Sequence, residues 1–205
     1  MNRAHSIVAA LCQQLTFVNI ELMSRGWGFS LRHAERLADA LTGEGLLRRT
    51  RVHAPPLLPL AKPLTVYRPD GAEPDCGHLS YLARSRWQSS CAPTWVYSAT
   101  PRAAQLFGGS AALPSETLKA RHELHMSEIF LRFRERRPGI EERWYRGDVA
   151  RRFGLVPGSR VPDAFLFCDC GNVEWAIEFI GAYSSTRIRG FHEFCKQHRY
   201  AYQVW

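Results

Sequence analysis

The stretch 161–205 constrains the fold most, because two apolar runs, a basic helical segment and a last apolar run follow one another there. The first run opens on Pro162-Asp163, and the second contains Glu178 among apolar neighbours. Short runs rich in aromatic and β-branched residues, bounded by turn residues, are typical of buried strands. The stretch therefore predicts strand, strand, helix, strand, with Asp163 and Glu178 on adjacent strands.

Composition bounds the class of protein. Of the 205 residues, 45% are apolar, which is enough for a packed core in one or two domains. No run approaches the roughly 20 apolar residues that a membrane helix needs. A secretion signal is not expected either, because Gln13 and Gln14 interrupt the apolar N-terminal stretch and no small-residue cleavage site follows. We therefore expect a cytoplasmic protein without membrane contact. The net charge of +8, from 27 Lys+Arg and 19 Asp+Glu, favours a polyanionic partner.

The first half of the chain has the element order of a winged helix-turn-helix. Apolar residues at helical spacing run through 3–23, and Ser30 precedes a second clear helix that stops near Gly43. Strands are expected at 46–52 and 64–68, separated by a proline-rich segment. Helices, a turn, a further helix and a two-stranded hairpin match this DNA-binding fold.

In such a fold the helix after Ser30 is the recognition helix, and the hairpin is the wing. We expect region 1–110 to bind double-stranded DNA through basic side chains near the start of this helix and on the first strand: Arg32, His33, Arg36, Arg48, Arg49 and Arg51. The alternative is a small helical domain on which these arginines form only a solvated face.

The middle of the chain is less regular. We expect a short helix at 79–87, a strand at 94–98, and a helix at 101–107 that ends at glycine. The segment 108–114 is the predicted linker between domains. A second domain, 115–205, is expected to begin with a long helix that runs to about Arg136.

The predicted order of 115–205 is helix, strand, strand, strand, helix, strand, so the class is α/β, of the α+β kind. With Pro162-Asp163 and Glu178 on two strands, it resembles the PD-(D/E)xK nuclease fold. The whole layout is similar to the replication-relaxation family of bacterial mobile-element proteins, in which a winged helix precedes such a domain. The matching residues are His125, Pro162-Asp163, Glu178 and Lys196.

The resemblance implies that active relatives bind a divalent metal through the aspartate and glutamate, while a lysine assists the attacking water. Here Ile180 occupies the place where that lysine is expected, two positions after Glu178. Arg187, Arg189 or Lys196 on the following helix could supply the cation, although arginine is a poor general base. A third carboxylate could come from Glu123 or Glu128.

The leading hypothesis is a DNA-binding regulator, or a replication or mobilisation accessory factor, whose nuclease-like domain is not catalytic. It needs no cofactor, and Arg187 and Arg189 add further DNA contacts. The alternative is a DNA endonuclease in which Asp163 and Glu178 hold Mg²⁺ or Mn²⁺ and Lys196 assists. A protein-interaction adaptor is a third reading. Winged helices often work as dimers on two-fold sites, so a homodimer is an expected partner.

The six cysteines predict free thiols, because nothing indicates a secreted protein. Cys76-Gly-His78 with Cys91 lacks the second paired spacing of a zinc site. Cys168-Asp-Cys170 is expected at a strand end and turn.

Overall fold

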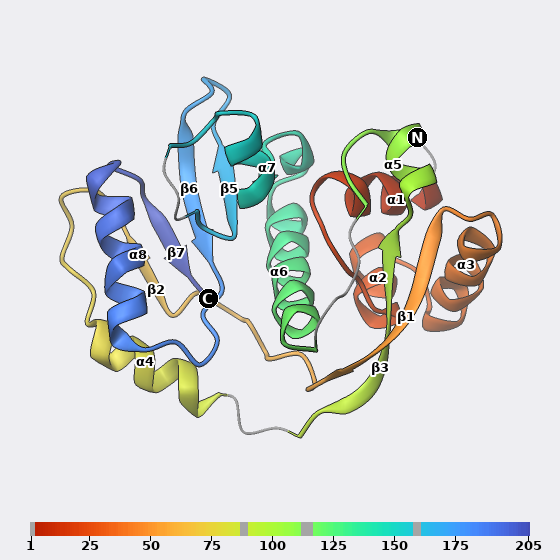
Figure 1. The fold of residues 1–205 in the computed structure, drawn as a ribbon, viewed down its shortest axis with the longest axis horizontal. Helices are drawn as coiled ribbons and strands as arrows, with labels where there is room; N and C mark the ends of the chain where they lie inside the picture. The colour runs from red at the N-terminus through yellow and green to blue at the C-terminus, as the bar shows by residue number, and fades with distance from the viewer. Residues whose placement is uncertain (1–2, 87–89, 112–116, 158–160) are drawn as a thin grey trace. The chain divides into compact units, whose positions relative to one another are not determined.

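The computed structural model describes residues 3–86, 90–111, 117–157 and 161–205. Its helices and two separate sheets confirm the α+β class (Figure 1). No helix in the described part of the chain has the length and apolar character needed to cross a membrane.

The chain divides into two compact units, each made of two segments. Unit 1 combines Met1–Leu57 with Ser90–Glu141, and unit 2 combines Leu58–Ser89 with Glu142–Trp205. This division differs from the linker expected at 108–114, which falls within the span of unit 1 and whose residues 112–114 lie outside the described ranges. The difference arises because the segment after the first long strand, expected to complete the wing, contributes to unit 2 instead.

Unit 1 begins with α1 (Arg3–Gln13) and α2 (Ile20–Trp27). Asn19 caps α2, because its side-chain oxygen accepts a hydrogen bond from Leu22 N–H at 2.8 Å. The helix continues through Trp27, and only Gly28, with a positive φ of 68°, ends it.

The next helix, α3 (Leu31–Gly43), begins where the sequence predicts, because Ser30 Oγ accepts a hydrogen bond from His33 N–H at 3.3 Å. Its buried residues are Ala34, Ala38 and Leu41, which recur at helical spacing along one side. The opposite side of α3 is therefore left to solvent.

A long two-stranded ribbon follows α3. In this ribbon β1 (Leu47–Ala54) pairs antiparallel with β3 (Ala92–Ala99) along the full length of both strands (Figure 1). The predicted hairpin of β1 with the strand near 64–68 is wrong, since β2 (Thr65–Tyr67) pairs with a strand of unit 2. β1 and β3 match in length, whereas β2 offers a much shorter edge, so the longer ladder satisfies more backbone groups.

Two further helices complete unit 1. Thr100 caps α5 (Pro101–Phe107) by accepting a hydrogen bond from Ala103 N–H at 3.1 Å, as its sequence predicts. The long helix α6 (Thr117–Arg136) packs against α2 and β1.

Unit 2 contains a five-stranded sheet in the order β2-β7-β6-β5-β4. The strands β4 (Trp144–Arg146), β5 (Ala164–Phe167) and β6 (Val173–Glu178) pair antiparallel, whereas β7 (Tyr202–Val204) is parallel to β6. A parallel pair requires a crossover, which α8 (Ser185–Gln197) provides. The strand, strand, helix, strand order predicted from the sequence is confirmed.

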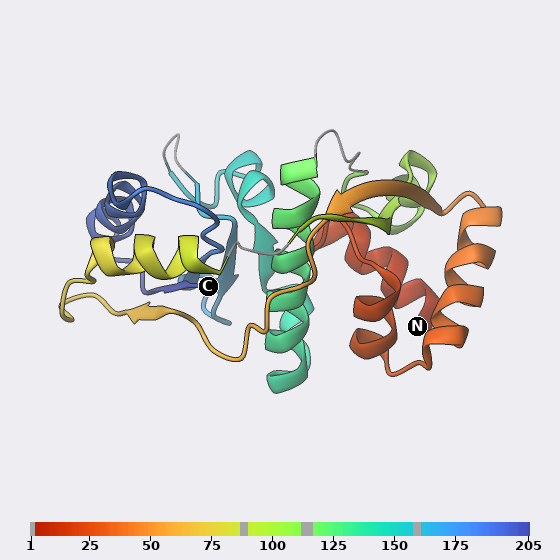
Figure 2. The same cartoon turned by 90° about the horizontal axis from the view of Figure 1, so that it is seen from below.

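Two helices cover one face of this sheet. α4 (Cys76–Ser85) packs against α8, and both contribute to a core with residues of β5, β6 and β7 (Figure 2). A single 3₁₀ turn, Ile140–Glu142, precedes β4, and a short helix, α7 (Gly147–Arg152), follows it. Trp205 is 1% exposed, and its main-chain N–H donates to the Glu178 carbonyl oxygen at 2.9 Å, so it extends the pairing of β7 with β6 by one residue.

Candidate nucleic-acid interface and carboxylate pair

Asp163 and Glu178 face each other across β5 and β6. Ala164 pairs with Ile177 in the ladder, which sets Asp163 opposite Glu178 on the same face of the sheet. The Glu178 carboxylate accepts a hydrogen bond from Asp163 N–H at 3.2 Å, and the Asp163 carboxylate accepts one from Phe179 N–H at 2.8 Å. We call these two residues the carboxylate pair. Each carboxylate thus has a main-chain donor on the neighbouring strand.

The backbone passes close to the carboxylate pair at Gly147, the first residue of α7, directly after β4 ends. The Gly147 N–H donates to the Asp163 carbonyl oxygen at 2.9 Å. A Cβ atom added at Gly147 would lie 1.9 Å from the Pro162 carbonyl oxygen, which no side chain can tolerate. Glycine is therefore required where β4 leads into α7, and it fixes the backbone that presents Asp163.

The position expected to hold a lysine belongs to the core. Ile180 is 1% exposed and packs with Ile188 and Phe191 of α8 in the core of unit 2. A charged side chain at this position would lose its hydration among the apolar residues of this core, which is costly in free energy. Ile180 is therefore a packing residue in this fold.

Lys196 makes an ion pair at the surface. Its Nζ donates to the carboxylate of Glu73, and both side chains are about half exposed or more. This hydrogen bond raises the pKa of Lys196 above its ordinary value. Lys196 therefore has a carboxylate partner other than the carboxylate pair.

The two arginines near the start of α8 are exposed. Arg187 donates to the Tyr183 hydroxyl at 2.7 Å and stacks over that ring, with Cζ 3.6 Å from its centroid. Arg189, two residues further along α8, is also exposed. Both remain accessible to an anion, and the Arg187 guanidinium is held flat by Tyr183.

The residues expected from α6 belong to unit 1. His125 is 1% exposed, and its Nδ1–H donates to the Arg121 carbonyl oxygen at 2.7 Å. Glu128 is 2% exposed and pairs with both Arg25 and Arg132. Among the described residues, no group of three or more His, Cys, Asp or Glu side chains could hold a metal ion. A hard cation at the carboxylate pair would thus find two carboxylates there, those of Asp163 and Glu178, and none from α6 is described beside them.

The solvent side of α3 carries the predicted recognition residues. Arg32, His33 and Arg36 are all exposed, and Arg32 and Arg36 lie opposite the buried stripe of the helix. The His33 ring stacks on Phe29, with centroids 4.7 Å apart. The exposure of these three side chains is compatible both with the predicted DNA contacts and with the alternative of a solvated face.

On β1 the predicted arginines divide between the two faces of the ribbon. Strand alternation sets Arg49 and Arg51 on one face and Arg48 on the other. The guanidinium of Arg49 stacks on Trp95 of β3, with Cζ 4.1 Å from the ring centroid, and that of Arg51 lies at 6.0 Å. Arg49 also forms a long ion pair of 3.7 Å with Asp39 of α3.

Trp95 was not among the residues that the sequence singles out. It lies in a predicted strand, and such tryptophans usually pack in a core, yet Trp95 is 43% exposed. Strand alternation with buried Val96 gives a weak signal of exposure. Its arginine neighbours cannot be read from the sequence, because they depend on the pairing of β1 with β3.

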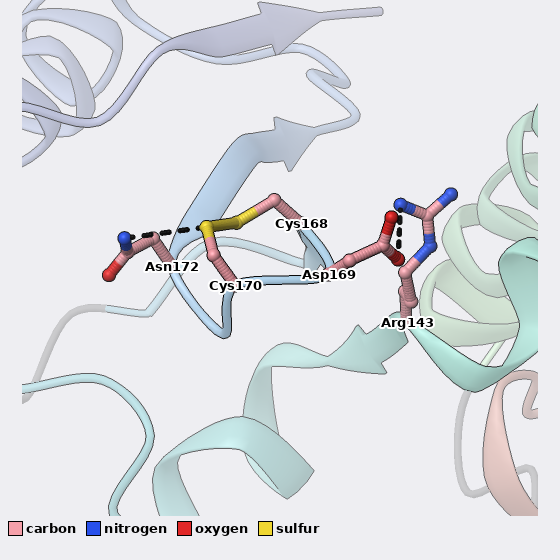
Figure 3. Close-up of a disulfide and its surroundings, with 5 residues drawn as sticks. All are labelled: Arg143, Cys168, Asp169, Cys170 and Asn172. Carbon is pink, nitrogen blue, oxygen red and sulfur yellow. Dashed lines mark hydrogen bonds and ion pairs between the residues drawn. A yellow bond between two sulfur atoms is a disulfide. The ribbon is translucent and has the colours of Figure 1, made fainter.

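Cys168 and Cys170 form a disulfide in the turn between β5 and β6, which contradicts the expectation of free thiols (Figure 3). The turn brings them together, since Gly171 N–H donates to the Cys168 carbonyl oxygen at 3.0 Å. Asp169, between them, pairs with Arg143 at 3.2 Å. The disulfide lies at the closed end of the β5–β6 hairpin, and the carboxylate pair lies at the open end.

The other cysteines are free. Cys12, Cys76 and Cys195 are buried, whereas Cys91 is exposed. Burial raises the pKa of the Cys12 thiol to about 11, so this thiol stays protonated at neutral pH.

Comparison with known proteins gives no family assignment: no family model matches the chain, and no curated protein and no solved structure is similar enough to count as a match.

Proposed function

We propose that the protein binds double-stranded DNA through unit 1, as a regulator or as a replication or mobilisation accessory factor. The observation that carries this proposal is the pair of exposed arginines, Arg32 and Arg36, on the side of α3 opposite its buried stripe. α3 would enter the major groove in the manner of a recognition helix, and the β1–β3 ribbon would contact the neighbouring backbone.

Three features support this proposal. The order α2, α3 and a ribbon matches a winged helix-turn-helix, with β3 in the place of the second wing strand. The ribbon carries Arg49 and Arg51 on one exposed face. The net charge of +8 attracts a polyanion at long range.

Titration of a labelled duplex with the full chain at increasing salt tests the proposal. Replacing Arg32 and Arg36 by alanine is expected to weaken binding at least about tenfold and to lower the salt slope by about two. The matched control replaces Arg151 and Arg152, two exposed arginines of α7, by alanine and removes the same charge. Equal losses in both variants would reduce the interaction to non-specific charge attraction, and no binding at low salt would overturn the proposal.

The second unit supports a nuclease-like domain that is not catalytic. Within unit 2 the order β4, β5, β6, α8, β7, with β7 parallel to β6, follows the one expected for the PD-(D/E)xK resemblance, whereas the long helix expected to open that domain, α6, belongs to unit 1. Ile180 is buried in the core, and Lys196 forms an ion pair with Glu73, so neither of these two expected positions supplies the basic group that this chemistry uses. Unit 2 would then add backbone contacts through Arg187 and Arg189.

A metal-dependent endonuclease is the second candidate, because Asp163 and Glu178 are opposed in register. Two carboxylates suit Mg²⁺ or Mn²⁺, and a bound cation would lower the pKa of its water and stabilise charge on a phosphate. Each carboxylate already accepts one main-chain N–H, which orients its oxygens. Incubation of supercoiled plasmid with the full chain and Mn²⁺ tests this candidate. Cleavage that both Asp163→Asn and Glu178→Gln abolish would establish it over the non-catalytic reading.

A further inference from the structure

The outer face of the β1–β3 ribbon combines an exposed aromatic ring with basic side chains. We define this outer face by Arg49, Arg51, His53 and Trp95, all of which are exposed. Arg51 lies directly opposite Trp95 in the ladder, and Arg49 lies opposite Tyr97. The two strands thus place guanidinium groups next to one indole ring by register alone.

Trp95 is not needed to close the core at this place. Its neighbour Val96 is fully buried on the other face of the ribbon, and Tyr97 on the same face is 3% exposed. Trp95 lies one pair further along the ribbon, where 43% of it stays in contact with solvent. An exposed aromatic ring beside arginines has the composition of a surface on which a nucleic-acid base can stack.

The Arg49 side chain is oriented by Trp95, and its other interaction, an ion pair with Asp39, is weak. Its guanidinium lies over the ring at 4.1 Å, an arrangement that leaves the planar N–H edge available to a phosphate. Its ion pair with Asp39 is long, at 3.7 Å, and both side chains are well exposed, 41% and 66%, so this pair contributes little. A phosphate could therefore replace Asp39 at low cost.

We propose that this outer face binds an unpaired DNA nucleotide next to a duplex, with the base stacked on the part of Trp95 that is exposed and not covered by Arg49, and the phosphate held by Arg49 and Arg51. The proposal rests on the proposed function of unit 1. An aromatic ring flanked by cations is how proteins hold single strands, because every base has a π face. Inside a duplex the π faces are covered by neighbouring base pairs, so a ring on a ribbon stacks on a base most readily where a nucleotide is unpaired, in an overhang, a loop or a fork.

Two labelled probes test this inference: a blunt duplex of about 20 base pairs, roughly two turns, and the same duplex with a short single-stranded dT overhang. The full chain is expected to bind the overhang probe roughly 5- to 100-fold more tightly than the blunt probe, the range that stacking of one base supplies. Trp95→Ala should abolish this preference, and Trp95→Phe should retain most of it.

The matched control is Tyr81→Ala, which removes an exposed aromatic ring from α4 of unit 2 and should leave the preference unchanged. Circular dichroism melting checks that each variant is folded. Equal binding of the two probes would overturn the inference and leave the duplex-binding function intact. Equal weakening of both probes by Trp95→Ala would also overturn it, because Trp95 would then only orient Arg49. Failure to bind any probe at low salt would overturn both.

Discussion

The arginines of unit 1 and the carboxylate pair of unit 2 differ in what holds them. Arg32 and Arg36 are exposed on a helix whose packing uses the opposite side, and Arg49 rests on an exposed ring. Asp163 and Glu178 are held by main-chain donors between two strands, and Glu178 is only 7% exposed. Groups that remain exposed are available to a ligand, whereas groups satisfied within the fold contribute first to stability.

The largest effect on stability is expected at Ile180, the position where the resemblance expects a lysine and the fold has a core residue. Ile180→Lys should lower the free energy of unfolding by about 3 kcal/mol or more, because a charge would enter the core of unit 2. Urea denaturation measures this loss, and Ile180→Val should cost only about 0.5–1.5 kcal/mol. The opposite outcome would be an Ile180→Lys variant that is as stable as the original protein and cleaves plasmid in Mn²⁺. The carboxylate pair would then have to be regarded as catalytic.

An intermediate effect is expected from the pair itself. Glu178→Ala leaves the Asp163 N–H without its acceptor in a mostly buried place, which should cost about 1–3 kcal/mol of unfolding free energy. Glu178→Gln keeps an acceptor oxygen and should cost less in the same denaturation experiment. If Glu178→Gln instead stabilises the fold, repulsion between the two carboxylates dominates, and the pair is better explained as a cation site.

Reduction of the Cys168–Cys170 disulfide should have a smaller effect. The loop that it closes has three residues, for which chain entropy predicts about 1.6 kcal/mol at most. Melting temperatures with and without a reductant measure the change, and free-thiol counting confirms the reduction. Because the disulfide is at the far end of the hairpin, the cost of Glu178→Ala should be the same in both states. A larger cost after reduction would show that the turn holds the register of the pair.

The smallest effect on stability is expected from Arg32→Ala with Arg36→Ala. Both side chains are exposed and lie away from the buried stripe of α3, so the free energy of unfolding should change by about 0.5 kcal/mol or less. The same protein should show the loss of duplex binding described above. A clear drop in the denaturation midpoint would mean that these arginines support the fold and would remove the contrast between the two regions.

The sequence predicts features that depend on nearby residues. Ser30 and Thr100 each begin a helix because their side chains accept a main-chain N–H within the next turn. The opposition of Asp163 and Glu178 was also predictable, since one short turn joins their strands. The pairing of β1 was not, because the partner that satisfies its ladder lies beyond a whole excursion of the chain. The exposure of Trp95 beside two arginines follows from that pairing and was missed with it.

The interleaved path of the chain has a consequence for how this protein can be inherited. Each unit consists of two segments, so no single break in the gene separates one from the other. A gene fragment for 115–205 would encode α6, which packs in unit 1, and would lose β2 and α4, which complete the sheet and core of unit 2. Recombination that exchanges contiguous pieces would damage both units. The exposed arginines of unit 1 and the carboxylate pair of unit 2 are therefore expected to be inherited together, as one indivisible coding block.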